Sequence, residues 1–269
     1  YFTRAKTYDA QKNSGNPYRK DNEMEVLSQI LNKERFISCH SYIQSEINML
    51  MKVAEKFDFN INTFTHILEG YKVADKMKAH GANVSTFSDW WNYKMEVVDA
   101  IPQNAFLMQK NGVNVAINSD DAEMARRLNH EAAKSIKYAG MSEEDALKMV
   151  TLNPAKMLHV ADRVGSIKEG KDADLVIWSD HPLSIYAKSE KTIVDGAVVF
   201  DREVDAKLQV DLKKEKQRLI QKMILAKKGG SATRPMTPSF REENMCEDDH
   251  GHGKSLWDRI SQRMILTEN

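Results

Sequence analysis

The sequence has little cysteine, and its two residues of this type, Cys39 and Cys246, lie far apart. They define no disulfide framework, so cysteine content leaves the cellular compartment open. Neither sign of charge is in excess, since 39 basic residues balance 39 acidic ones, and this balance gives no support to a polyanionic partner. No apolar run approaches the length that crosses a bilayer. We therefore expect a globular protein with neither nucleic acid nor membrane as a partner.

Glycine-rich phosphate-binding loops are also absent after the strands that the pattern predicts. Short β-rich runs alternate with helix-forming segments, and they lie at residues 35–40, 60–66, 82–88 and 113–117. Their polar ends are His40, His66, Ser88 with Asp89, and Asp120. Regular alternation without a phosphate loop favours a parallel barrel over an open sheet. Because a full barrel has eight units and four are readable here, we predict an α/β fold containing the second half of a (β/α)8 TIM-type barrel.

The helices of the chain are predicted from apolar residues at helical spacing and from residues that typically begin or end a helix. They cover residues 21–32, 44–57, 69–80, 97–110, 122–138, 142–150, 151–159 and 203–228. Asp21 is a candidate cap, and residues 142–145 form a capping-box pattern. Residues 1–20 are polar with a loop at 13–17, and no helix is predicted there.

Two consecutive acids, Asp120 and Asp121, end the fourth predicted strand and precede a helix. Aspartate is a preferred helix N-cap, whereas a carboxylate at the carboxyl end of a βα strand is a common place for chemistry. Taken alone, each of the two residues is better explained as a helix cap than as a carboxylate that takes part in chemistry. Together they allow both roles, with one acid capping the helix and the other facing a pocket.

Beyond residue 160 the periodicity changes to that of β-structure. Residues 164–178 and 191–200 form β segments joined by glycine and aspartate turns, and Asp195-Gly196 between two apolar runs predicts a hairpin. We assign residues 1–160 to the barrel portion and 161–203 to strands of a small β-sandwich domain. Residues 204–269 then contain a charged helix, a linker at 229–238 and a polar tail with a second short helix at 256–265.

Three side chains are candidates for one site at the mouth of the barrel, because His40, His66 and Asp120 each end a different strand. Imidazole and carboxylate are ligands that Zn²⁺ or a similar divalent ion accepts. Such an ion lowers the pKa of bound water from ~15.7 towards ~7, and a nearby carboxylate can take the proton. Each histidine alone is better explained as a packed or solvated strand end, but three equivalent positions favour a site.

These residues and three further motifs resemble the amidohydrolase superfamily, in particular its imidazolonepropionase-like branch. The similarity runs from about residue 35 to 201, and its most specific parts are residues 117–121 (Ile-Asn-Ser-Asp-Asp), 151–156 (Thr-Leu-Asn-Pro-Ala-Lys) and 164–176, which lead into 181–183 and 194–196. The resemblance implies a barrel that holds one or two divalent metal ions, with zinc as the expected metal, and a composite β-sandwich. It places His40, His66 and Asp120 at strands five, six and eight.

The resemblance also implies roles for these residues. His40 would ligate metal, His66 would ligate metal or contact substrate, and Asp120 would ligate metal and act as the general base. Trp90 and Trp91, which follow Asp89, would lie at the same mouth. They are candidates for substrate binding, although a hydrophobic plug is an equal alternative.

One departure concerns the first metal ligands of the family, a His-x-His pair at strand one, because no such pair precedes His40. The only pair, His250-Gly-His252, lies in the tail near Cys246 and three acids, where adventitious metal binding or a solvated tail are the alternatives. Since the chain also starts at Tyr1 rather than methionine, we expect the N-terminal half of the protein to be missing from it.

The predicted function is that of a metal-dependent amidohydrolase that cleaves a C–N bond, amide or cyclic amide, in a small-molecule substrate through metal-activated water, with Asp120 as the base. Two alternatives stay open: a metallo-dipeptidase of the same superfamily, and a non-catalytic binding or scaffold protein derived from the barrel. A homo-oligomer is compatible with the sequence. Some members of the family are exported, so a periplasmic location is our expectation, with the cytoplasm as the alternative.

Overall fold

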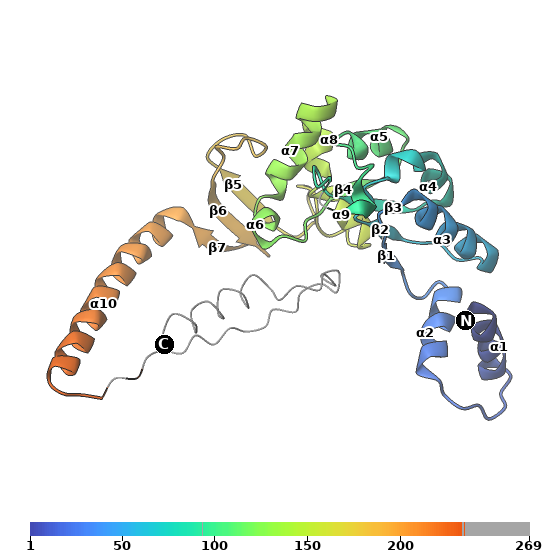
Figure 1. Cartoon of the computed structure of the whole chain (residues 1–269), viewed down its shortest axis with the longest axis horizontal. Coiled ribbons are helices and arrows are strands. Elements are labelled where there is room, and N and C mark those ends of the chain that lie inside the picture. Colours follow the sequence, from blue (N-terminus) through green and yellow to red (C-terminus); the bar gives the residue numbers. More distant parts are fainter. Residues whose placement is uncertain (93, 233, 235–269) are drawn as a thin grey trace. The chain divides into compact units, whose positions relative to one another are not determined.

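A four-stranded parallel sheet forms the centre of the larger part of the chain. The computed structural model describes residues 1–92, 94–232 and 234. Its strands are β1 (Ser38–His40), β2 (Thr63–Thr65), β3 (Asn83–Thr86) and β4 (Val115–Ile117), and they pair in the order of the sequence (Figure 1). This parallel arrangement confirms the predicted α/β class. Closure into a barrel and the β-sandwich stay predictions.

Helices cover most side chains of β2, β3 and β4, whereas β1 is more exposed. All three residues of β4 are buried, as are Phe64 in β2 and Val84 in β3. The covering helices are α3 (Gln44–Phe57), α4 (Ala74–His80), α5 (Asn104–Lys110), α7 (Leu128–Ala139), α8 (Glu143–Lys148) and α9 (Leu152–Met157). All of these helices except α9 share one core cluster with the strands, which includes Ile47, Met77, Met108 and Met149. Burial of this apolar surface is the main stabilising term of the sheet.

Several helix ends follow from single residues, as the sequence predicts. Asp21 accepts hydrogen bonds from the amides of Glu23 and Met24 and caps α2 (Asn22–Leu31). Ser142 accepts from the amide of Asp145 at the start of α8. At the other end of α4, Gly81 adopts φ +83°, a left-handed conformation that glycine enters without steric cost.

Two predicted helices are interrupted. The segment 97–110 consists of a short 3-10 turn, η2 (Met95–Val97), and α5, which begins only at Asn104, because Pro102 disfavours helical backbone in the residue before it. The segment 122–138 divides into α6 (Ala122–Ala125) and α7, since Arg127 has non-helical dihedral angles. Both breaks lie close to the loops that carry the site.

The helix at 69–80 also starts differently from the prediction, with a separate 3-10 turn, η1 (Gly70–Lys72), before α4. A whole helix, α1 (Phe2–Asn13), was not predicted. Although its sequence is mostly polar and charged, two of its residues, Ala5 and Tyr8, are buried in a small cluster with Met24 of α2. The helix is therefore stabilised by tertiary packing rather than by its own amphipathic pattern.

A three-stranded antiparallel sheet follows the barrel-like part. Its strands are β5 (Leu175–Trp178), β6 (Ser189–Val194) and β7 (Ala197–Asp201), in that order. The predicted hairpin joins β6 to β7, with φ of +50° at Asp195 and +77° at Gly196. Positive φ at both central residues is the geometry that matches the twist of antiparallel strands.

The chain divides into two compact units, residues 1–212 and 213–269. The predicted charged helix is α10 (Arg202–Lys228), and none of its residues is buried. The linker beyond residue 234, the predicted helix at 256–265 and the His250-Gly-His252 pair lie outside the described residues. Among the helices that the structure describes, none combines the length and the apolar character needed to cross a membrane.

Candidate functional site at the strand ends

The carboxyl ends of the four parallel strands bring the predicted site residues to one edge of the sheet. His40 is the last residue of β1, and it pairs in register with Thr65 of β2. His66 directly follows β2, while Asn118 and Asp120 follow β4. Parallel pairing places all these ends on the same side. The sequence order of the strands thus becomes the spatial order of the site residues.

His66 occupies the centre of this edge and has an unusual backbone. Its φ is +62°, a left-handed conformation that is uncommon outside glycine, although histidine enters it more often than most residues. Such positions concentrate at functional sites. The side chain of His66 is 14% exposed, and its Nε2 atom lies 3.5 Å from Oδ1 of Asp120. Its other ring nitrogen, Nδ1, lies 2.6 Å from Nδ2 of Asn118.

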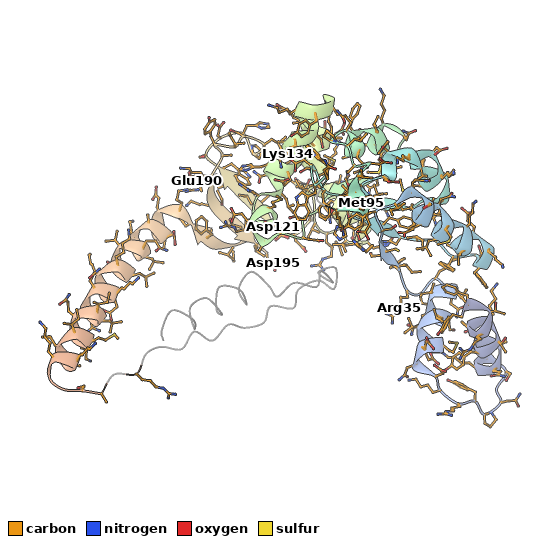
Figure 2. All side chains as sticks on the ribbon, in the orientation of Figure 1. Arg35, Met95, Asp121, Lys134, Glu190 and Asp195 are labelled. Carbon is orange, nitrogen blue, oxygen red and sulfur yellow. The ribbon has the colours of Figure 1, made fainter. Side chains whose placement is uncertain are left out.

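The two consecutive acids separate into the two roles that the sequence left open. Asp121 caps α6, because its carboxylate accepts a hydrogen bond of 2.8 Å from the amide of Met124, and Figure 2 labels it beside that helix. Asp120 instead lies against His66, with its side chain 27% exposed. This partial exposure leaves the carboxylate accessible to water and to a small molecule.

His40 extends the row of ionisable groups. Its ring lies 4.7 Å from that of His66, centroid to centroid, at an angle of 67°. A third ring, that of Tyr42, lies 4.8 Å from His40, centroid to centroid, and the ammonium of Lys94 lies 4.1 Å from the centroid of Tyr42. The three residues predicted as ligands are therefore adjacent along the edge.

The donor types of this row, two imidazoles and a carboxylate, fit a divalent ion such as Zn²⁺. Across residues 1–92 and 94–232, however, no three His, Cys, Asp or Glu side chains surround a common point where a metal ion could bind. The row provides one close pair, His66 with Asp120, and a histidine beside it. Their chemistry fits a metal, and the assignment of ligands stays a prediction.

An aromatic stack leads from His66 towards the predicted tryptophans. Phe87, which follows β3, stacks on His66 at 4.7 Å, and Trp90 stacks on Phe87 at 4.4 Å. The indole Nε1 of Trp90 also lies 2.9 Å from Sδ of Met124. Trp90 thus packs into a small cluster above the sheet, whereas Trp91 is 40% exposed. Substrate contact by either residue stays a prediction.

A partly buried ion-pair network connects α7 to the loop after β3. Glu131 of α7 accepts hydrogen bonds from Ser88 and from Lys134, and Lys134 also pairs with Asp89 at 2.8 Å. Figure 2 labels Lys134 on this helix. Burial lowers the pKa of the Lys134 ammonium, but its hydrogen bonds to Asp89 and Glu131 outweigh burial, so the pKa is raised overall. Lysine therefore stays charged between the two carboxylates.

Phe87, Asn118, Tyr42 and Lys94 are residues of this region that the sequence analysis did not assign. Phe87 and Asn118 directly follow strands and Tyr42 lies two residues beyond β1, so the rule that selected His66 and Asp120 could have found them. Their apolar or uncharged side chains gave no chemical signal. Lys94 follows the tryptophan pair without any motif, and only the fold reveals its contact with Tyr42.

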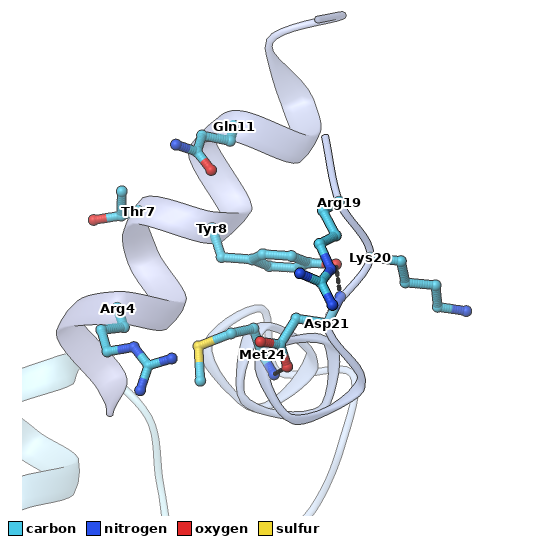
Figure 3. A pocket seen from close by; sticks show the side chains of 8 residues that line it. All are labelled: Arg4, Thr7, Tyr8, Gln11, Arg19, Lys20, Asp21 and Met24. Atoms are coloured by element: carbon cyan, nitrogen blue, oxygen red, sulfur yellow. Dashed lines mark hydrogen bonds between the residues drawn. The ribbon is translucent and has the colours of Figure 1, made fainter. Parts of the chain in front are cut away.

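A separate surface pocket of about 670 Å³ lies at α1 and α2 (Figure 3). Arg4, Arg19 and Lys20 line it together with Tyr8, whose hydroxyl accepts a hydrogen bond from the amide of Asp21. None of the predicted site residues lines this pocket. The strand-end row therefore stays the candidate site.

Comparison with known proteins identifies the fold. A crystal structure of an amidohydrolase from Thermotoga maritima MSB8 superposes with a TM-score of 0.68 and 34% identity, over 75% of this chain and 54% of that one. Amidohydrolase tasK of Hapsidospora irregularis is 29% identical over 187 residues, which are 68% of this chain and 19% of that protein. The imidazolonepropionase of Thermoplasma volcanium is 27% identical over 173 residues, covering 61% of this chain and 42% of that protein.

The chain thus spans less than half the length of these two curated relatives. The sequence model of the Amidohydrolase family matches residues 103–202. This segment contains β4, Asn118, Asp120 and the antiparallel sheet. The match and the similar structure agree with the motifs at residues 117–121 and 164–176. Residues 103–202 are therefore similar to the amidohydrolase family, and three quarters of the chain resemble a solved amidohydrolase in fold.

Proposed function

We propose that this protein is a metal-dependent amidohydrolase that hydrolyses a C–N bond, amide or cyclic amide, in a small molecule. The observation that carries the proposal is the pair of His66 Nε2 and Asp120 Oδ1, 3.5 Å apart at the strand ends, with His40 beside it. The similarity of residues 103–202 to the amidohydrolase family supports the same class of reaction. An imidazolonepropionase among the relatives favours a cyclic amide as substrate.

Asp120 would act as the general base. Its carboxylate is 27% exposed, so water can reach it beside the imidazole of His66. The carboxylate would take a proton from the attacking water and deliver it to the leaving nitrogen. Proton transfer by a positioned group of this kind contributes about 10²–10⁴-fold in rate.

His40, His66 and Asp120 would hold the divalent ion, for which zinc is our choice. When bound, such an ion polarises the carbonyl and lowers the pKa of water from about 15.7 towards about 7. His66 is suited to a fixed role, since its backbone is held in a left-handed turn and its ring stacks on Phe87 at 4.7 Å. A ring fixed in this way loses little further freedom on binding.

Phe87, Trp90 and Tyr42 would form the apolar wall beside the base. Tyr42 packs against His40, Phe87 stacks on His66, and Trp90 stacks on Phe87. An apolar wall limits the number of water molecules at the reacting bond and strengthens electrostatic interactions there. Trp91, which is 40% exposed, is the residue through which the wall would contact substrate.

The test compares Asp120→Asn with Asp121→Asn in the purified protein. We expect Asp120→Asn to lower kcat by at least 100-fold on the best substrate of a panel of cyclic amides and dipeptides, because the base is lost. Asp121→Asn is the matched control, since asparagine is an equally good cap, and it should retain kcat. Equal turnover in both variants would refute the role of Asp120.

A scaffold role is the second candidate. The observation that favours it is that, in the described part of the chain, no three potential ligands are grouped around one point. Zinc content of the purified protein, measured by mass spectrometry, separates the two candidates. Stoichiometric zinc that is lost in Asp120→Asn supports the hydrolase, whereas the absence of metal together with inactivity on the whole panel supports the scaffold.

A further inference from the structure

Asn118 is the residue that connects the end of β4 to His66. Its backbone amide donates to the carbonyl of Thr86 at 3.1 Å, which extends the β3–β4 ladder beyond its last paired residue, Ile117. This bond fixes the main chain. The side chain is then directed towards β2, where Nδ2 lies 2.6 Å from Nδ1 of His66.

The other atom of the Asn118 carboxamide, Oδ1, is buried and has no hydrogen-bond partner in the described structure. A buried acceptor without a partner is unfavourable, and in native proteins it calls for an explanation. Here the absence of a partner for Oδ1 affects how the Asn118 carboxamide can rotate. Because Oδ1 makes no hydrogen bond, the amide can rotate by a half turn without breaking any bond except the one to His66.

The two orientations of the amide select different tautomers of His66. When Nδ2 donates to Nδ1, the proton of the neutral imidazole resides on Nε2, where it faces Oδ1 of Asp120 at 3.5 Å. When Oδ1 accepts from Nδ1–H instead, the lone pair of Nε2 is available to a cation. The partner of one ring nitrogen thus decides what the other nitrogen can do.

No other side chain next to Asn118 is placed to perform this selection. The hydroxyl of Ser119 donates to the carbonyl of Asp121 and accepts from its amide, both at 3.1 Å. Asp121 itself caps α6. Both neighbours are therefore used within their own turn, and Asn118 alone of this segment has a described contact with Nδ1 of His66.

We propose that Asn118 is a positioning residue that sets the tautomer of His66 by rotation of its carboxamide, donating to Nδ1 in the metal-free protein and accepting from Nδ1–H when Nε2 binds a cation. The inference rests on the proposed function in one respect, since it takes Nε2 of His66 as a ligand. The tautomer in the metal-free protein is independent of that function.

The first measurement is the tautomer of His66 by ¹⁵N NMR of histidine-labelled, metal-free protein at alkaline pH, where the ring is neutral. The wild-type protein should carry the proton on Nε2. Asn118→Asp replaces the donor by acceptor oxygens only, so His66 should change to the Nδ1–H form. The same tautomer in both proteins would overturn the inference, whether or not the protein is a hydrolase.

The second measurement is zinc affinity by competition with a chromophoric chelator. Asn118→Leu should weaken zinc binding 10- to 100-fold, as loss of a partner behind a metal-ligating histidine does. Asn114→Leu is the matched control, because the amide of Asn114 donates to Asn83 at the opposite end of β4 and should not influence zinc. Equal losses in both variants would refute the inference, since they would show a structural effect.

The outcomes also separate this inference from the proposed function. A wild-type protein that binds no zinc contradicts the metal-dependent hydrolase, while the tautomer exchange in Asn118→Asp still supports the selection by Asn118. A wild-type protein that binds zinc, with unchanged affinity in Asn118→Leu, supports the hydrolase and overturns the role of Asn118.

Discussion

Replacement of Lys134 by methionine tests whether the network between α7 and the loop after β3 stabilises the protein. Lys134 pairs with Asp89 and Glu131, each at 2.8 Å. The Glu131 side chain is only 6% exposed, so Lys134→Met leaves a buried carboxylate with the Ser88 hydroxyl as its remaining described partner. Methionine has a similar length and keeps the apolar contacts of the lysine stem.

The expected cost follows from burial. Removal of one partner of a fully buried ion pair costs about 3–5 kcal/mol, whereas exposed pairs contribute about 0–1 kcal/mol. Lys134 is 30% exposed and Asp89 20%, so water replaces part of the lost interaction. We therefore expect the free energy of unfolding to fall by about 2–3 kcal/mol, between these two limits.

Urea unfolding followed by far-UV circular dichroism measures this change. Lys137→Met is the control, because Lys137 is exposed on the same helix and such surface changes stay within about 0.5 kcal/mol. Adding Glu131→Gln to Lys134→Met should recover part of the loss, because no uncompensated charge is then buried at Glu131. A cost of Lys134→Met no larger than that of Lys137→Met would refute the reasoning.

Two further predictions concern backbone conformation and pH. Gly165→Ala should lower the free energy of unfolding by about 2–4 kcal/mol in thermal unfolding, because φ is +84° and the new Cβ would lie 2.7 Å from the Cβ of Ala155. Gly170→Ala is the control, since φ is +85° there but no atom lies within 4 Å of the new Cβ, and it should cost about half as much. Equal costs in the two variants would contradict the predicted clash at Gly165. The hydrogen bond from Lys12 holds the pKa of Glu25 below its usual 4.5. The stability that the Glu25 carboxylate contributes is therefore fully present above pH 4.5 and is lost as the pH falls through the lower pKa of Glu25 in the folded protein. Protection of the α1 amides against hydrogen exchange should decrease over that pH range. Glu25→Gln should abolish this pH dependence.

The sequence predicts elements well where local signals determine them. The bounds of α3, Gln44–Phe57, are those expected from its apolar spacing, and Asp21 caps α2 as its position before the helix indicates. Asp195 and Gly196 adopt the hairpin conformation, because turn geometry depends on the residues of the turn itself. Each of these features is decided within a few residues of chain.

Tertiary contacts decide what the sequence did not reveal. The helix α1 depends on the packing of Ala5 and Tyr8 against another helix, which no local pattern records. The predicted row of His40, His66 and Asp120 could be placed at one edge of the sheet from strand ends alone. The contact of Asn118 with His66 spans 52 residues, and an asparagine after a strand carries no signal of its partner.

Because the order of the strands in space is their order in the chain, the site residues come together through neighbours only. β1 pairs with β2, β2 with β3 and β3 with β4, so each of these four described strands pairs with a strand that is next to it in the chain. Short sequence separations of this kind reduce the loop-closure entropy and accelerate folding. During synthesis these four strands can therefore pair one after another, and His40, His66 and Asp120 can lie side by side once α6 has left the ribosome.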